Sequence, residues 1–194
     1  REALSRRLFD LQASEALGGM FSAEVTNIEL AKELDAGKLV FIRLDKMQLG
    51  DETSVTATVF LAMALAAMWG RRIGDYDNPP LDWRIYMDEF VDFLNEGGHS
   101  VLLDFLAQAR KFNVGLVIAH QHIVQLPASV RGGLRSSQVR IFARLEETPE
   151  VLSEAARSIK TTTGFIDQLR KHPGSHGDFA VWIEDRIHEA ARLR

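Results

Sequence analysis

Two adjacent carboxylates, Asp88 and Glu89, follow the apolar stretch 83–87 and are the residues best placed for chemistry. A strand that is buried on both faces reads as a continuous apolar run, and its polar chemistry appears where the run ends. One carboxylate at such a point can hold the water shell of Mg²⁺, while its neighbour orients or deprotonates an attacking water. The pair therefore predicts nucleotide hydrolysis. The same spacing also fits a simple turn, in which Asp88 caps the next element and Glu89 is solvated.

Two later residues can join this pair. A predicted helix over 100–112 ends in Arg110 and Lys111, where the helix dipole favours positive charge. The apolar run 114–119 then leads to Gln121, and we expect its amide at the same sheet edge as Asp88, where it can sense a γ-phosphate or position water.

Apolar runs alternate with helical stretches along the chain, which predicts parallel βαβ units. We expect an α/β fold with a mainly parallel sheet and helices on its faces. The predicted strands are 38–44, 83–88, 114–119, 139–145 and 178–184. The predicted helices are 51–73 or 53–73, 100–112, 127–137, 149–159 and 161–171.

Glycines set several predicted boundaries. The pair at 18–19 is expected to break the helical lead-in, and the pair at 97–98 is expected to lie in a loop before the next helix. A short helix capped by Thr26 or Asn27 should end at Gly37, because glycine readily adopts the left-handed conformation that closes a helix.

Composition narrows the class of protein. With 194 residues, 46% of them apolar and 26% charged, the chain has the balance of one globular domain rather than a disordered or fibrous protein. A net charge of −4 argues against an overall basic surface, and the absence of cysteine excludes disulfides and thiolate metal sites. The apolar run 55–69 is shorter than the ~20 residues of a bilayer span, so it predicts a buried helix.

The stretches 86–90, 106–112 and 115–121 together resemble the motor domains of conjugative coupling proteins and related type IV secretion ATPases. These proteins form the HerA/FtsK-type branch of the RecA-like P-loop ATPases. The resemblance is specific over residues 84–127 and looser elsewhere. It implies a RecA-like fold, ATP and Mg²⁺ as cofactors, and a hexameric ring that moves DNA or powers protein export. It also implies a cytoplasmic location, at the inner face of the membrane where a further N-terminal region supplies an anchor.

The resemblance also implies a role for each matching residue. Asp88 would serve Mg²⁺ through water, and Glu89 would be the catalytic carboxylate. Arg110 matches the arginine that reaches the nucleotide of a neighbouring subunit, and Gln121 matches the sensor glutamine.

One part of the family pattern is missing. The 194 residues contain no Gly-x-x-x-x-Gly-Lys-Ser/Thr segment, and Gly37-Lys38 lacks the earlier glycine. We therefore expect the C-terminal part of a RecA-like ATPase domain, with residues 1–37 as a helical lead-in, 38–184 as the αβ core and 185–194 as a tail. Such a fragment should hydrolyse ATP weakly or not at all. The alternative is a non-hydrolysing interaction or nucleic-acid-binding module built on the same fold.

A metal site is a weaker interpretation. His120 and His122 lie two residues apart at a predicted strand end, and with Asp88 they would supply three ligands for zinc or manganese. No other ligand has supporting spacing, which disfavours this interpretation.

Four arginines cluster in the sequence around the helix 127–137 and the strand after it. They could face DNA or a neighbour's phosphates, or they could form a solvated face beside Glu146 and Glu147; the second interpretation is favoured for most of them. The four are Arg131, Arg135, Arg140 and Arg144, of which the last two are reserve candidates for the trans-acting cation. Trp83 and Trp182 are expected to be packing residues.

Overall fold

The computed structural model describes residues 15–25, 28–50, 52–71, 81–121, 125–144, 148–169 and 177–193. The chain forms two compact units, residues 1–120 and residues 121–194. The first unit contains a small parallel sheet and the second an antiparallel one, so the mixed α/β class is confirmed.

A βαβ unit forms the centre of the first unit. Strand β1 (Trp83–Met87) pairs in parallel with β2 (Val114–Ile118), and α6 (Glu96–Gln108) connects them. The register sets Trp83 opposite Val114 and Met87 opposite Ile118. Two short 3₁₀ helices, η1 (Phe90–Asp92) and η2 (Ala109–Phe112), flank α6. The predicted strands 83–88 and 114–119 and their parallel crossover are thus confirmed.

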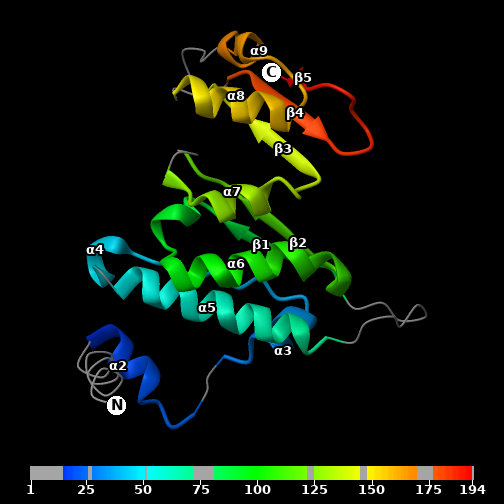
Figure 1. Ribbon diagram of the computed structural model, residues 1–194. Coiled ribbons are helices and arrows are strands. Elements are labelled where there is room, and N and C mark those ends of the chain that lie inside the picture. Colours follow the sequence, from blue (N-terminus) through cyan, green and yellow to red (C-terminus); the bar gives the residue numbers. More distant parts are fainter. Residues whose placement is uncertain are drawn as a thin grey trace. The chain divides into compact units, whose positions relative to one another are not determined.

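Helix α5 (Glu52–Trp69) runs beside α6 and in the same direction (Figure 1). Near their starts, Thr58 Oγ1 lies 3.2 Å from Asn95 Oδ1, and near their ends Trp69 Nε1 donates to Gln108 Oε1 at 3.2 Å. By length and composition α5 could cross a membrane, but one such helix is also typical of a soluble core. Its buried residues include Leu61, Leu65 and Met68, as expected for a buried helix.

The glycine pair at 97–98 lies in the first turn of α6, so the predicted loop there is wrong. Asn95 caps the helix by accepting a hydrogen bond from the Gly98 N–H at 2.9 Å. A Cβ on Gly98 would lie 2.7 Å from Thr58 Oγ1 and 2.9 Å from Leu94 Cδ2. Gly98 is therefore required for close packing of α5 on α6.

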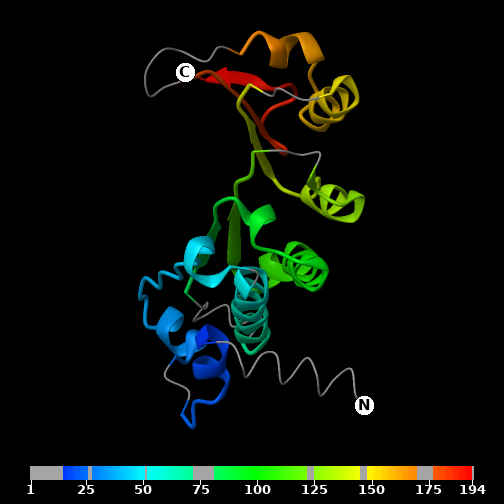
Figure 2. The ribbon, with the colours of Figure 1, turned by 90° about the vertical axis from the view of Figure 1, so that its left-hand side faces the viewer.

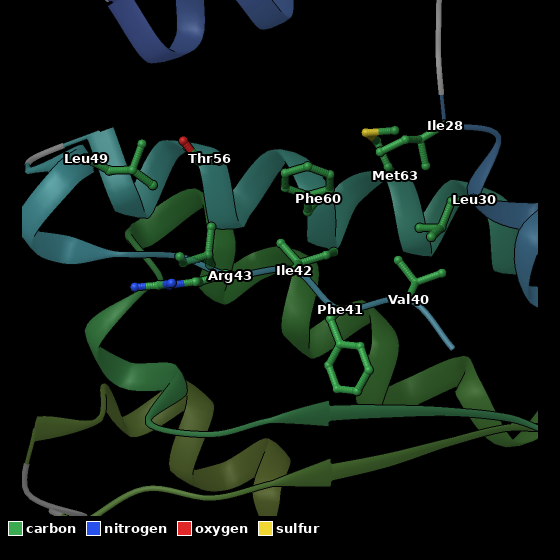
Figure 3. Close-up of a pocket in the computed structure, with 11 residues that line it drawn as sticks. Ile28, Leu30, Val40, Phe41, Ile42, Arg43, Leu49, Thr56, Phe60 and Met63 are labelled. Atoms are coloured by element: carbon green, nitrogen blue, oxygen red, sulfur yellow. The ribbon is translucent and has the colours of Figure 1, made fainter. Parts of the chain in front are cut away.

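The segment 38–45 is extended but is not a strand in the part of the chain that the structure describes, so the predicted strand at 38–44 is wrong. Its side chains still alternate: Val40 and Ile42 face α5, while Phe41 points away from it (Figure 3). A cavity of about 310 Å³ lies between this segment and α5. Leu39 and Phe41 are 78% and 84% exposed. A strand needs a hydrogen-bonding neighbour, and no described strand pairs with this one.

The helices before α5 are short. Helix α2 (Glu15–Phe21) continues through the glycines at 18–19, so the predicted break there is wrong. Helix α3 (Leu30–Asp35) is followed by Gly37, as predicted, and the positive φ of Gly37 (71°) lets the next N–H, that of Lys38, reach the Glu33 carbonyl at 3.1 Å. The predicted caps at 26–27 lie outside the described residues, and the N-cap of α3 is Glu29 instead. Helix α4 (Lys46–Leu49) begins after Asp45, which accepts a hydrogen bond from the Met47 N–H.

An antiparallel sheet with helices on it forms the second unit, with strands β3 (Val139–Phe142), β4 (Phe179–Ile183) and β5 (Ala191–Leu193) in that order. The expectation of a mainly parallel sheet is wrong for the described strands, because β3, β4 and β5 pair antiparallel. The chain between β3 and β4 does not cross back to the end of the sheet at which β3 begins, as a parallel pair would require. The unit's helices are α7 (Ala128–Leu134), α8 (Pro149–Ser158) and α9 (Thr163–Asp167). Figure 2 shows α8 nearly end-on beside the strands.

The core of the second unit lies between α8, α9 and β4. Its buried residues are Ala155, Ala156, Ile159, Ile166, Leu169, Ala180 and Trp182. Strand β5, in a stretch expected to be a tail, is tied to this core because Arg192 donates through Nε to the buried Asp178 at 3.0 Å.

Candidate functional site

The two carboxylates lie at a tight corner after β1. The Ala119 N–H donates to the Met87 carbonyl at 2.8 Å, and the Phe90 N–H donates to the Ala119 carbonyl at 3.4 Å. The chain after β1 therefore turns back onto the carboxyl end of β2 and leaves Asp88 and Glu89 between these two bonds. Phe90, 1% exposed, packs edge-on against the His120 ring, with 5.5 Å between centroids. The corner is thus fixed by both backbone and side-chain contacts.

Glu89 occupies the left-handed backbone region, with φ 48° and ψ 41°. That conformation costs an ordinary residue about 1–2 kcal/mol, whereas Asn and Asp tolerate it better. The described residues other than glycine with positive φ are Asn113, Asp185, Glu89 and Lys160, and the last two have no intrinsic preference for it. Local strain of this kind is concentrated at functional sites.

The strained turn determines how the carboxylates are presented. Asp88 is exposed and Glu89 is half-buried, at the carboxyl edge of a parallel strand pair. This is the edge at which open α/β sheets bind ligands. The predicted position of both residues at a strand end is confirmed, and an exposed carboxylate such as Asp88 fits a hydrated Mg²⁺.

Arg110 lies at the other end of the same two strands, where β1 and β2 begin. It belongs to η2, and its carbonyl accepts a hydrogen bond from the Asn113 N–H at 3.3 Å. The Asn113 carbonyl in turn accepts from the Trp83 N–H at the start of β1. Because the five residues of β2 separate Arg110 from the carboxyl edge, it is not brought together with Glu89 of its own chain.

Gln121 is exposed and is the first residue of the second unit, directly after His120. His120 contacts Phe90, as described above. The sensor role of Gln121 stays a prediction. His122 lies outside the described residues. In the part that is described, no group of three His, Asp or Glu side chains is arranged to hold a metal ion.

The start of β1 is held by a buried cation that the sequence did not single out. The guanidinium of Arg71 stacks 4.0 Å from the Trp83 ring and lies 3.7 Å from Asp35, and it also donates to the Leu81 carbonyl. Burial lowers the pKa of Arg71, and the charges of Asp35 and Asp82 oppose this shift. Trp83 is 3% exposed, which confirms its role in packing, and its indole donates to Asp35 at 3.1 Å.

The arginine cluster is organised around Glu154 and Trp182. Glu154 lies 2.6 Å from Arg135 and 3.9 Å from Arg131, and Arg140 stacks 4.6 Å from the Trp182 ring. Glu146 and Glu147, the expected neighbours, lie outside the described residues.

Arg131 and Arg140 are half-buried, whereas Arg135 and Arg144 are exposed. Burial lowers the pKa of Arg140, Glu184 opposes the shift and Arg135 adds to it. Arg140 is also fixed by hydrogen bonds from its guanidinium to the carbonyls of Ser158 and Arg135. It is therefore held within its own unit, which disfavours it as a trans-acting cation.

Sequence reasoning missed three members of this cluster, because Glu154, Arg157 and Lys160 come from α8 and the turn after it and carry no motif.

No family model matches the chain, and its sequence matches no curated protein.

Proposed function

We propose that the chain is part of the ATP-hydrolysing motor domain of a ring ATPase that translocates DNA or serves type IV secretion or conjugation. The observation that carries this proposal is the Asp88–Glu89 corner. Two carboxylates stand at the carboxyl edge of a parallel strand pair, and the second is held in a strained backbone conformation. A RecA-like fold, with further strands beside β1 and β2, is part of the proposal.

Each residue has a defined task in this reaction. Asp88 would hold Mg²⁺ through water, and the ion would neutralise charge on the β- and γ-phosphates. Glu89 would orient the attacking water and accept its proton, and the half-buried position of its carboxylate supports this. Gln121 would contact the γ-phosphate.

Arg110 would act on the nucleotide of a neighbouring subunit. Its exposed position at the sheet edge remote from Glu89 supports action in trans rather than in cis. A ring, hexameric by resemblance, supplies such a neighbour. DNA or secretion-machinery proteins would be the partners, and the cytoplasm, at the membrane's inner face, would be the location.

Phosphate binding needs a segment that the 194 residues do not contain. No Gly-x-x-x-x-Gly-Lys-Ser/Thr loop is present to cradle the phosphates. We therefore expect these 194 residues on their own to hydrolyse ATP very slowly. A Glu89-dependent ATPase rate from these residues alone would contradict this part of the proposal.

The test measures phosphate release from ATP by the natural protein that carries these residues. Glu89→Gln should lower kcat by about 10²–10⁴-fold and leave the affinity for ATP nearly unchanged, because the carboxylate acts in the transition state. Asp92→Asn, three residues away and paired with Lys46 at 3.1 Å, is the matched control and should retain activity. Equal activity of Glu89→Gln and the wild type would refute the proposal.

Mixing variants tests the trans role of Arg110. Arg110→Ala should abolish hydrolysis but retain ATP binding. When Arg110→Ala and Glu89→Gln subunits are mixed, some interfaces carry an intact Glu89 beside a neighbour's intact Arg110, so activity should partly return. No recovery, or loss of ATP binding in Arg110→Ala, would assign Arg110 to its own subunit.

A non-hydrolysing interaction module is the second candidate. Tyr86 and Val117 lie side by side on the open face of β1 and β2 and are 72% and 48% exposed, which favours a docking surface. Retained partner binding in Tyr86→Ser with normal ATPase activity would argue against this candidate.

A further inference from the structure

A cavity of about 330 Å³ in the second unit is lined mainly by cations. Its walls come from the residue that follows α7, from α8 and the turn after it, and from β3 and β4. They carry Arg135, Arg140, Arg157 and Lys160 against the single carboxylate of Glu154. The lining therefore has an excess of three positive charges in a protein whose net charge is −4. Such a concentration of like charge favours an anionic ligand.

The one carboxylate does not neutralise the whole cluster. Glu154 is engaged by Arg135 at 2.6 Å and by Arg131 at 3.9 Å. Among the residues that the structure describes, neither Arg157 nor Lys160 forms an ion pair. Arg157 makes only a backbone contact, from Nε to the Ser153 carbonyl at 3.2 Å. Both side chains are exposed, so their charged groups are free to meet a ligand.

The ring of Trp182 lies beneath two of these cations. The cations of Arg140 and Lys160 lie 4.6 Å and 5.3 Å from the centre of the Trp182 ring. Two buried donors here, Arg140 Nε and Trp182 Nε1, have no hydrogen-bond partner within the described part of the chain. Buried donors normally have a partner.

Lys160 adds a second sign of a functional role. Its backbone has φ 53°, a conformation that lysine does not favour, directly after the last turn of α8. The conformation holds the lysine side chain above Trp182 and at the cavity. Strain retained at a charged residue that lines a cavity is typical of ligand sites.

We infer that this cavity binds a phosphate group through Arg157, Lys160 and Arg135. Guanidinium groups match the oxygens of phosphate in charge and geometry, and an ammonium adds a point charge. Trp182 is only 4% exposed, so it offers no face on which a base could stack. A phosphate in a nucleic-acid backbone would therefore be bound without regard to sequence, and free phosphate would use the same contacts. The site is independent of the proposed ATPase chemistry.

NMR of the tryptophan indoles tests this inference on the whole chain. The three tryptophans give three indole N–H signals, and that of Trp182 reports the cavity, while Trp69 and Trp83 are internal controls. Titration with sodium phosphate should shift the Trp182 signal saturably, and sodium chloride at matched ionic strength should not. A short single-stranded oligonucleotide forms the second arm. Saturation at a lower concentration than with phosphate identifies a nucleic-acid backbone, and no gain identifies free phosphate.

A double variant provides the decisive comparison. Arg157→Gln with Lys160→Asn removes two charges, and asparagine tolerates the positive φ at position 160. We expect at least a tenfold loss of affinity for phosphate. Arg186→Gln, an exposed cation of the same unit outside the cavity lining, should bind as the wild type does. An unshifted Trp182 signal with both probes, an equal shift with chloride, or wild-type affinity in the double variant would each overturn the inference.

Discussion

Replacing Glu89 by glycine should make the first unit more stable than replacing it by alanine. Both changes remove the carboxylate, so their difference isolates the backbone at φ 48° and ψ 41°. This conformation costs alanine about 1–2 kcal/mol of strain, whereas it causes no such strain in glycine. Glycine instead loses about 0.5–1 kcal/mol more conformational entropy on folding. The net expectation is a free energy of unfolding about 0.5–1 kcal/mol higher for Glu89→Gly.

Urea unfolding measures this difference. The indole signal of Trp83 reports the first unit alone, which avoids treating two units as one transition. In thermal unfolding, the same difference corresponds to a shift in Tm of about 2–4 °C. Asp92 also lies in the turn after β1 but has no positive φ, so it is the control. The Asp92→Gly variant should be less stable than the Asp92→Ala variant. If glycine is also the less stable residue at position 89, the strain argument is refuted.

Three further outcomes are expected. Asp35→Ala should cost about 1–3 kcal/mol because it leaves the Trp83 indole without its acceptor, and Asp35→Asn, which keeps an oxygen there, should cost less in the same urea assay. Hydrogen bonding of Glu150 to its own backbone N–H, at the start of α8, lowers the pKa of this carboxyl. Its stabilising contribution is therefore present above its ordinary pKa of 4.5 and lost at lower pH, so acid should shift the unfolding midpoint less in Glu150→Gln than in the wild type. Gly98→Ala should destabilise the first unit by about 1–3 kcal/mol, since its Cβ would meet Thr58 Oγ1 at 2.7 Å. Gly132→Ala in α7 meets nothing within 4 Å and should instead stabilise its helix, and equal effects at the two glycines would contradict the packing argument.

The βαβ unit was predictable because its signals are local. The apolar runs that became β1 and β2 and the helical stretch between them each carry their own pattern. The same pattern failed at Leu39 and Phe41, because an apolar run does not specify whether another strand will pair with it. Strand β5 is only three residues long, and its attachment through Arg192 to Asp178 joins positions 14 apart in sequence. Pairing of this kind depends on tertiary contacts that no local window contains.

The site residues divide in the same way. A strand end identifies Asp88 and Glu89, but nothing in the residue type of glutamate indicates the left-handed backbone of Glu89. The arginine cluster was visible in the sequence, whereas its counter-ion Glu154 and the cation Lys160 are supplied by a helix and turn that follow later in the chain. Composition locates charge along a sequence, and the fold decides which charges meet.

The common direction of α5 and α6 has an electrostatic consequence for the carboxyl edge of the first unit's sheet. Both helices begin at the edge where Asp88 and Glu89 lie, since α6 leaves the end of β1 and α5 starts beside it. Each helix start carries a partial charge of roughly +0.5, which favours negative groups that lie within about one turn of it. The two helix dipoles point the same way and give this end of the sheet a positive component of field toward an incoming polyanion.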